Sequence, residues 1–259
     1  MASLWPAYQC ISAEQRDDIA VITLQRPAAA NSLSSTTVRE LSDAIAVVRR
    51  EDALRALVFT GSGDKVFCAG ADLKERREHP GKDWEIRRPL LQFWNELWML
   101  PKPLVIAANG HAAGGGFELL MLADAVVVGE HAQFWLPEIQ WGGIPGGWGT
   151  QMLPRIVGPV LARWIILNGH RLSAADLLHH GLATHCVPSP EVLPTALEAA
   201  SRLAQRPAAA VACAKEAMRH ALATPLLTGV EFEDRLLQVA AAAPERAAGL
   251  ERFARGERA

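Results

Sequence analysis

The chain has 259 residues, of which 50% are hydrophobic and 21% are charged, a balance that excludes intrinsic disorder, a collagen-like chain and a coiled coil. Its 26 Lys and Arg against 28 Asp and Glu give a net charge of −2, without the basic excess of a dedicated nucleic-acid-binding domain. No apolar run reaches the roughly 18 residues of a membrane span, so we expect neither a nucleic-acid nor a membrane partner.

The first half of the chain alternates short β-branched segments with helical patterns, which is typical of an α/β fold with covered sheet faces. A helix is expected over residues 37–49, and Thr37 with Glu40 has the form of an N-terminal capping box. A second helix is expected over residues 84–100, before Pro101. The expected strands cover residues 19–24, 57–60, 104–108 and 125–128.

From about residue 173 onward the pattern is mostly helical and rich in alanine. The candidate helices cover residues 189–204, 207–222, 228–242 and 244–255. We therefore expect an α/β core over residues 1–190 and a helical region over residues 191–259. Four amphipathic helices need a surface to bury, and a neighbouring subunit would provide one.

The cysteines and histidines give no metal or disulfide pattern. The four cysteines are far apart and form no C-x-x-C pair, which is typical of reduced thiols in a cytosolic protein. The first nine residues lack the basic and apolar regions of a secretory signal, so we expect a cytoplasmic protein. No histidine has the spacing of a metal ligand, and no metal is expected. The cysteines are Cys10, Cys68, Cys186 and Cys213.

A glycine triplet, Gly114–Gly116, follows one predicted strand and leads into a helix. Residues without Cβ let a ligand approach the backbone, and N–H groups at a helix start are unpaired within the helix. Such a turn suits a developing oxyanion or a phosphate, or it is a tight turn with no ligand. A P-loop is disfavoured because no G-K-[ST] follows, and a dinucleotide site because no G-x-G-x-x-G is present.

Two carboxylates lie near the glycines among apolar neighbours. Glu118 directly follows the triplet, and Glu138 follows Pro137 twenty residues later. A buried carboxylate is costly unless it is paired or used, although a first-turn glutamate and a surface-loop glutamate are the simpler alternatives. Two carboxylates beside an oxyanion site can divide acid and base roles when their environments separate their pKa values.

Together these segments resemble the enoyl-CoA hydratase (crotonase) family along most of the chain. The resemblance rests on residues 22–27 with 31–34, on 70–74, on Asn109-Gly110 with the glycine triplet, and on Pro137-Glu138 with Gly142, Pro145 and Gly149-Thr150; Lys215-Glu216 matches a late helix motif. It implies a spiral core of repeated ββα units followed by a helical C-terminal trimerisation region. It also implies homotrimers that often pair into hexamers.

The resemblance implies a CoA thioester substrate and no further cofactor, since coenzyme A is part of the substrate. The backbone N–H groups of Ala71 and Gly115 would bind the thioester oxygen. CoA would lie along Ala71, Asp72, Leu73 and Lys74, and also against Gly115 and Gly146.

The same resemblance narrows the reaction, because hydratases of the family have both glutamates, whereas many isomerases keep only the second. Glu118 would orient and deprotonate the water that attacks C3, and Glu138 would supply the proton to C2 on the same face. The leading expectation is therefore reversible syn addition of water to a 2-trans-enoyl-CoA. An enoyl-CoA isomerase or another reaction of this scaffold is the alternative, and an RNA-binding homologue is disfavoured by the net charge.

Two departures from the family pattern concern the ligand. Ala28 stands where a basic residue is common near the CoA phosphates, so Lys74, Arg255 or Arg258 would have to replace it. Three tryptophans surround Glu138, and at least one is expected to wall the acyl pocket, with packing beneath the turn as the alternative. They are Trp135, Trp141 and Trp148.

Overall fold

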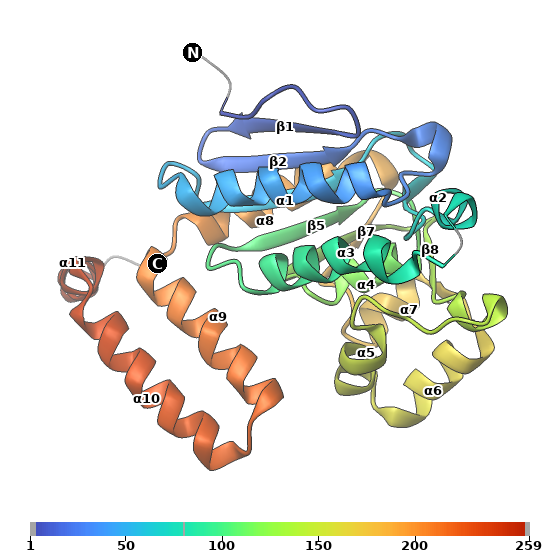
Figure 1. Ribbon diagram of the computed structural model, residues 1–259. Coiled ribbons are helices and arrows are strands. Elements are labelled where there is room, and N and C mark those ends of the chain that lie inside the picture. Colours follow the sequence, from blue (N-terminus) through green and yellow to red (C-terminus); the bar gives the residue numbers. More distant parts are fainter. Residues whose placement is uncertain (1–3, 80, 257–259) are drawn as a thin grey trace.

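The computed structural model describes residues 4–79 and 81–256 (Figure 1). In this part of the chain the larger sheet has the strand order β1-β2-β3-β5-β7-β10, and all neighbours are parallel except β1 and β2. Strands β3 and β5 are buried at every position, as in a sheet covered on both faces. The bounds are Ile11–Arg16 (β1), Ile19–Leu24 (β2), Ala56–Gly61 (β3), Leu104–Ala108 (β5), Ala125–Gly129 (β7) and His185–Val187 (β10).

A smaller sheet has the order β4-β6-β8-β9, with β8 and β9 antiparallel. Successive strands alternate between the sheets: β3, β5 and β7 join the larger one, and β4, β6 and β8 join the smaller one. Helices follow each pair, so the expected repeat of ββα units is confirmed. The bounds are Val66–Cys68 (β4), His111–Ala113 (β6), Gln133–Trp135 (β8) and Leu172–Ser173 (β9).

Helices cover both faces of the larger sheet (Figure 1). On one face, α1 (Ser35–Arg50) and α3 (Asp83–Trp98) lie over the main core, which takes Ile22 and Leu24. On the other face, α8 (Val192–Ala204) packs against Ile19 and Val21. The alternation along β2 follows from the period of two in a strand.

The start of α1 differs from the expected capping box. The N-cap is Ser34, whose side chain accepts the Thr37 N–H at 3.2 Å, so the helix begins before Thr37. Glu40 instead accepts the backbone N–H groups of Gln9 and Cys10 at 2.9 and 2.8 Å. The Thr37–Glu40 prediction is wrong because a serine three residues earlier serves as the N-cap and Glu40 has partners on the N-terminal segment.

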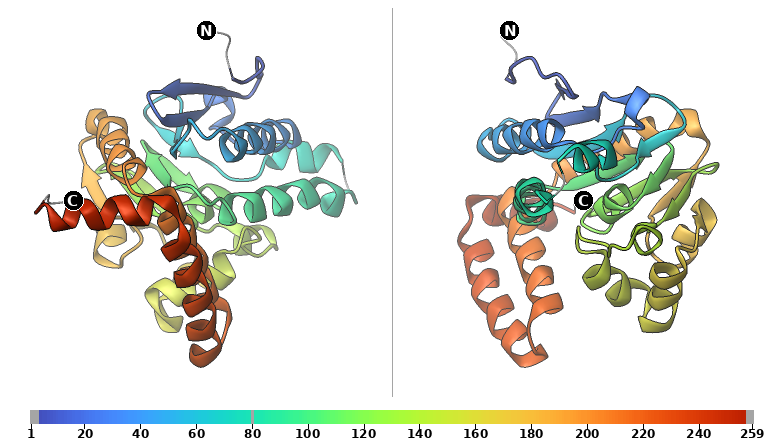
Figure 2. Two further views of the ribbon diagram at one scale, coloured as in Figure 1. Left: turned by 90° about the vertical axis from the view of Figure 1, so that its left-hand side faces the viewer. Right: turned by 45° about the vertical axis from the view of Figure 1, so that its right-hand side comes forward.

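The C-terminal helices differ in what they pack against. Whereas α8 packs on the sheet, α9 and α10 pack on each other and project from the core as a hairpin (Figures 1 and 2). Lys215 on α9 ties the hairpin to the core, since its ammonium pairs with Asp124 and donates to Lys102 O at 2.8 Å. The bounds are Ala208–Ala223 (α9), Leu226–Ala242 (α10) and Pro244–Ala254 (α11).

Candidate active site

Two glycine-containing turns meet beside the smaller sheet. Strands β4 and β6 are parallel neighbours, and the turns at Gly70 and Gly114 follow them. Gly70 has φ +83°, and a Cβ there would lie 2.7 Å from Ala113 O and 2.8 Å from Gly115 N. Only glycine allows this approach, so the sequence brings Gly70, Ala71 and Gly115 together.

Ala71 and Gly115 offer backbone N–H groups in this place. Hydrogen bonds on both sides fix the first turn, because Leu33 N donates to Gly70 O and Asp72 N donates to Leu33 O. Among the described residues the Ala71 N–H has no acceptor. Gly115 is the first residue of α4 (Gly115–Leu120), so its N–H has no acceptor within the helix. Two free backbone N–H groups in one place are the feature that an oxyanion hole requires.

Glu118 lies within α4 and is only 2% exposed. Its Oε1 accepts the N–H groups of Gly147 and Gly149 at 2.8 and 2.7 Å. Burial is the main cause that raises the pKa of Glu118 to about 7; the two N–H groups and the charge of Arg87 act in the opposite direction, while Glu138 adds to the rise. The carboxyl therefore exchanges a proton near neutral pH, as a general base or acid must.

The sequence analysis did not predict that Gly147 and Gly149 contact Glu118. A Cβ on Gly147 would lie 2.7 Å from Glu118 Oε2, and a Cβ on Gly149 would lie 2.8 Å from Oε1, so both positions require glycine. Trp94 on α3 completes the arrangement, because its Nε1 donates to Gly147 O at 2.5 Å. The glycines were recognised as a motif, but their contact with Glu118 spans about thirty residues and leaves no local signal.

Glu138 begins a single 3₁₀ turn, η2 (Glu138–Trp141), which two residues separate from the end of β8. Its Oε1 lies 2.7 Å from the position of a Cβ on Gly114, so the carboxylate faces the glycine triplet. Its Oε2 is buried without a hydrogen-bond partner among the described residues. Burial raises the pKa of Glu138, against the opposing effects of its own N–H and the charge of Arg76.

The predicted CoA segment lies at the start of α2 (Leu73–Glu78). Asp72 is the N-cap and accepts the N–H groups of Lys74 and Glu75 at 3.1 and 3.3 Å. Its other oxygen pairs with Arg26 at 2.9 Å, and although burial acts to raise it, these bonds hold the pKa of Asp72 below its ordinary value. Leu73 and Lys74 are exposed, so this segment presents its outer surface to a ligand.

The remaining predicted residues lie around the Glu138 turn. Gly146 O accepts Arg87 Nη2 at 3.4 Å. The Trp135 ring lies 4.2 Å from the Arg171 guanidinium, and Trp148 packs edge-on against Trp98 at 5.4 Å. Trp141 is 72% exposed. The structure therefore does not gather the three predicted tryptophans into one wall.

The described side chains give little support for a cysteine nucleophile or a metal site. Burial raises the pKa of Cys68 to about 12, so its thiol stays protonated at neutral pH and is a poor nucleophile. Within residues 4–79 and 81–256 no three His, Cys, Asp or Glu side chains gather as a metal site would require. In the same part of the chain, no helix is both long and apolar enough to cross a bilayer.

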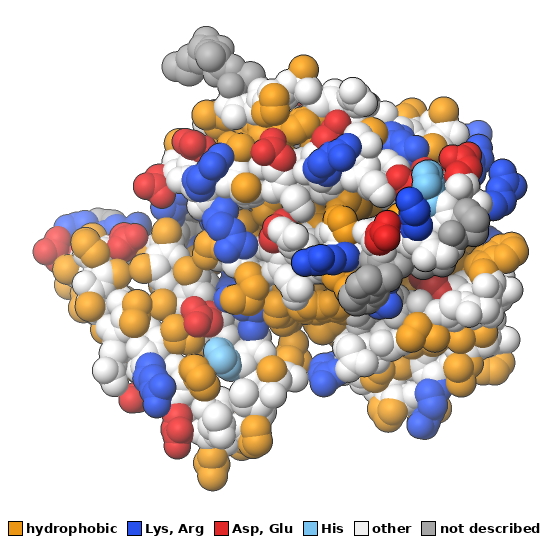
Figure 3. All heavy atoms as spheres, in the orientation of Figure 1, with side chains coloured by type: hydrophobic (Ala, Val, Ile, Leu, Met, Phe, Trp, Pro, Cys, Tyr) orange, Lys and Arg blue, Asp and Glu red, His pale blue; other side chains and the backbone are white. Residues whose placement is uncertain are grey.

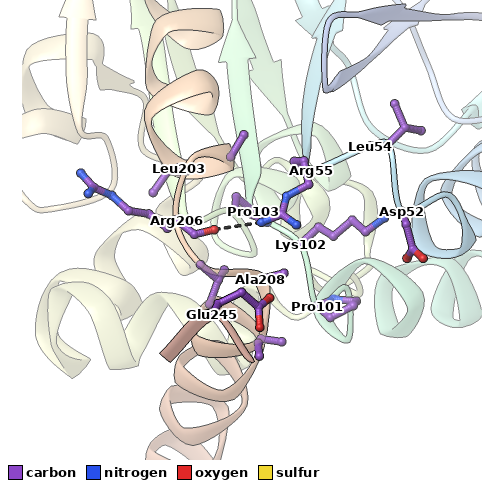
Figure 4. Close-up of a pocket in the computed structure, with 14 residues that line it drawn as sticks. Asp52, Leu54, Arg55, Pro101, Lys102, Pro103, Leu203, Arg206, Ala208 and Glu245 are labelled. Carbon is purple, nitrogen blue, oxygen red and sulfur yellow. Dashed lines mark hydrogen bonds between the residues drawn. The ribbon is translucent and has the colours of Figure 1, made fainter. Parts of the chain in front are cut away.

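A separate cavity of about 430 Å³ lies where α8 ends and α9 begins (Figure 4). Arg55 crosses it and donates to Arg206 O at 2.9 Å, and Lys102 and Glu245 also line it. Neither Glu118 nor Glu138 lines it. We therefore take the Glu118–Glu138 region, rather than this cavity, as the candidate active site.

Comparison with known proteins identifies the family of this chain. A family model described as enoyl-CoA hydratase/isomerase matches residues 14–258. A mitochondrial enoyl-CoA hydratase of Pongo abelii is 37% identical over 95% of this chain and 85% of its own length. A 2,3-dehydroadipyl-CoA hydratase of Escherichia coli is 37% identical over 94% of both chains. The solved structure of an enoyl-CoA hydratase from Bacillus anthracis has a TM-score of 0.92 and 34% identity, covering 96% of this chain and 97% of that one.

The chain belongs to the enoyl-CoA hydratase/isomerase family. The expected crotonase-like fold, with its α/β core and C-terminal helices, is confirmed by these structures and by the strand order.

Proposed function

We propose that this enzyme is a hydro-lyase that adds water reversibly, with syn geometry, across the 2,3 double bond of an enoyl-CoA thioester. The observation that carries the proposal is the pair of buried carboxyls with raised pKa values beside two free backbone donors. Relatives at 35–37% identity that are named enoyl-CoA or 2,3-dehydroadipyl-CoA hydratases support it. Because the proposed reaction is reversible, the enzyme would also catalyse dehydration.

The N–H groups of Ala71 and Gly115 form the proposed oxyanion hole. Attack of water at C3 of the enoyl thioester pushes electron density onto the thioester oxygen. Fixed donors stabilise this enolate-like charge without reorganising during the reaction, and one such donor typically contributes about 10²–10³ in rate.

Glu118 is the proposed base and Glu138 the proposed acid. With a pKa of about 7, Glu118 is substantially ionised at neutral pH and can take a proton from the attacking water. Glu138 has a pKa raised by burial and an Oε2 without a hydrogen-bond partner among the described residues, and it is the proposed donor of the proton to C2. After the product leaves, Glu118 releases its proton and Glu138 takes one up, by exchange with solvent water, so that both carboxyls regain their starting states.

Coenzyme A enters as part of the substrate, and no other cofactor is required by the proposed steps. Its adenine end would lie along the backbone of residues 71–74, and the thioester end would reach Gly115 and Gly146. The exposed Lys74 is the proposed contact for a CoA phosphate, together with Arg255. Arg258, the other basic residue considered for this role, lies outside the described residues.

For the acyl pocket we propose Trp141 as the wall. In a 3₁₀ turn the side chains at positions i and i+3 eclipse, so Trp141 lies on the same side of η2 as Glu138. Its ring is 72% exposed and is free to contact an acyl chain, whereas Trp135 and Trp148 already have ring partners. A flat apolar ring there would limit bulk and offer a stacking surface.

We also propose that the chain forms homotrimers, and that trimers pair into hexamers. Hydrophobic side chains gather over the α9–α10 hairpin, which projects from the core (Figure 3). Exposed apolar patches often mark protein–protein contacts, and a neighbouring copy would cover these side chains. The exposed apolar residues on these two helices are Met218, Leu222, Leu226, Leu227, Val230, Leu237 and Val239.

The proposed function is tested by following the loss of absorbance of the conjugated thioester in crotonyl-CoA and in longer, branched and aromatic enoyl-CoAs. Glu118→Gln and Glu138→Gln should each lower kcat by at least about 10², the usual size of a general acid or base contribution. A 3-enoyl-CoA in the same panel distinguishes an isomerase. Full turnover by either variant on the best substrate would contradict that residue's role.

A further inference from the structure

Helix α3 contacts the 146–149 turn through a line of side chains on one face. Arg87, Trp94 and Trp98 are spaced by seven and four residues, a spacing that places them on the same side of a helix. Arg87 donates to Gly146 O, Trp94 donates to Gly147 O, and Trp98 packs its ring against Trp148. Three consecutive residues of the turn are therefore held by one helix.

Trp148 has an unusual backbone for a bulky residue. Its φ is +76°, in the left-handed region that favours glycine, and it is the N-cap of α5 (Gly149–Val157). Such a conformation persists only where the surroundings impose it. Here the Trp148 ring lies 5.4 Å from the Trp98 ring at an interplanar angle of 66°, a favourable edge-to-face contact that holds the residue in place.

The same turn determines where Glu118 is held. Trp148 lies between Gly147 and Gly149, and the N–H groups of both glycines donate to Glu118 Oε1. Because the left-handed backbone at Trp148 turns both N–H groups toward one oxygen, the ring contact on α3 and the carboxylate position are linked through a single residue.

We propose that Trp98 and Trp148 form a clamp that fixes the 147–149 turn against Glu118, so that both are positioning residues for the base of the reaction. The inference rests on the proposed function. Neither ring needs to touch the substrate, because each acts through the two backbone donors.

Loss of the clamp should shift the pH dependence of kcat in a defined direction. Four groups affect Glu118: the N–H groups of Gly147 and Gly149 and the charge of Arg87 lower its pKa, and Glu138 raises it. Loosening the turn weakens the two N–H contacts while burial persists, so the pKa of Glu118 rises. A base with a raised pKa is protonated over a wider range, and the acidic limb of the kcat profile moves to higher pH.

The experiment compares kcat–pH profiles of wild type, Trp98→Ala, Trp98→Phe and Trp148→Gly on the best enoyl-CoA of the panel. Trp98→Ala should move the acidic limb up by about one pH unit and lower kcat about tenfold, with KM changed less than about twofold. Trp98→Phe keeps an edge-to-face ring and should return toward wild type. Trp148→Gly keeps the left-handed backbone but loses the ring, and should show the same upward shift.

Trp164→Ala is the matched control, since Trp164 is a 55% exposed tryptophan on α6 (Pro159–Asn168), and its profile should match wild type. Trp148→Gly decides the question if Trp98→Ala does not fold. Folded clamp variants with the wild-type profile would overturn the clamp, as would a shift in Trp98→Ala without one in Trp148→Gly. If the wild-type enzyme hydrates none of the enoyl-CoA substrates, this result overturns the proposed function instead.

Discussion

Gly149 donates its backbone N–H to Glu118 Oε1 at 2.7 Å, and the space that a side chain at Gly149 would need is occupied by the same oxygen, 2.8 Å away. One residue thus supplies a donor and leaves room for the acceptor. A change in either the Glu118 carboxylate or the 147–149 turn would therefore disturb the other.

Gly149→Ala should therefore lower kcat by about 10- to 100-fold, since the added methyl displaces the Glu118 carboxylate from its donors. Gly143→Ala is the matched control on the neighbouring loop, because a Cβ there would make only an ordinary contact, 3.5 Å from Glu138 O. Steady-state hydration with both variants checks this. Equal rates for the two alanines would show that the packing at Gly149 is unimportant.

Gly115→Pro tests the donor at the oxyanion hole. Proline is tolerated at the first position of a helix, where Gly115 lies, yet it removes the N–H. We expect a folded protein with a rate lower by about 10²–10³. Gly115→Ala retains the N–H, and its Cβ would have no neighbour closer than 3.6 Å, so the fold accommodates it. Full activity in the proline variant would remove Gly115 from the oxyanion hole.

Glu118 should make stability fall as pH rises. Burial raises the pKa of Glu118 to about 7 from an ordinary 4.5, so between these values the folded state binds more protons than the unfolded state, and unfolding becomes easier with increasing pH. Glu118→Gln removes this contribution. Urea unfolding at pH 5 and pH 8 should show the variant gaining stability relative to wild type at the higher pH; a pH-independent difference would contradict the raised pKa.

Trp141→Gly should change the ranking of acyl groups in kcat/KM while leaving CoA binding intact. Apolar pockets discriminate one methylene by about 1–3 kcal/mol, so the shift should be graded across the panel. Trp135→Gly is the comparison, since the Trp135 ring lies on Arg171 rather than beside Glu138 on η2. Identical rankings in wild type and Trp141→Gly would exclude Trp141 as the wall.

Features carried by local pattern were predicted well from the sequence. Strands such as β2 and β5 follow from runs of buried β-branched and aliphatic residues, and the glycine turns follow from their composition. The resemblance to a known family then led to Ala71, Gly115, Glu118 and Glu138 as site residues. These roles remain predictions that the proposed variants test.

Features that depend on distant contacts could not be predicted in this way. Trp94 and Trp98 have the pattern of core residues on an amphipathic helix, and nothing near them indicates that they contact a turn fifty or more residues later. The cap of α1 was misassigned because two overlapping local patterns compete, and only the N-terminal segment bound by Glu40 decides between them.

The glycine triplet has a consequence for mutational tolerance. A side chain at Gly114 would meet the Glu138 carboxylate, Gly115 presents a free N–H, and a Cβ at Gly116 would lie 2.1 Å from Cys68 O. A saturation library scored by hydratase activity should show few tolerated substitutions at the three positions. The amount of folded protein separates them: Gly116 variants should fail to accumulate, whereas Gly115→Pro should accumulate as inert protein. The triplet is therefore under one folding constraint, at Gly116, and two constraints from the chemistry of the site, at Gly114 and Gly115. Because these constraints differ, a substitution elsewhere that relieves one of them would not relieve the others.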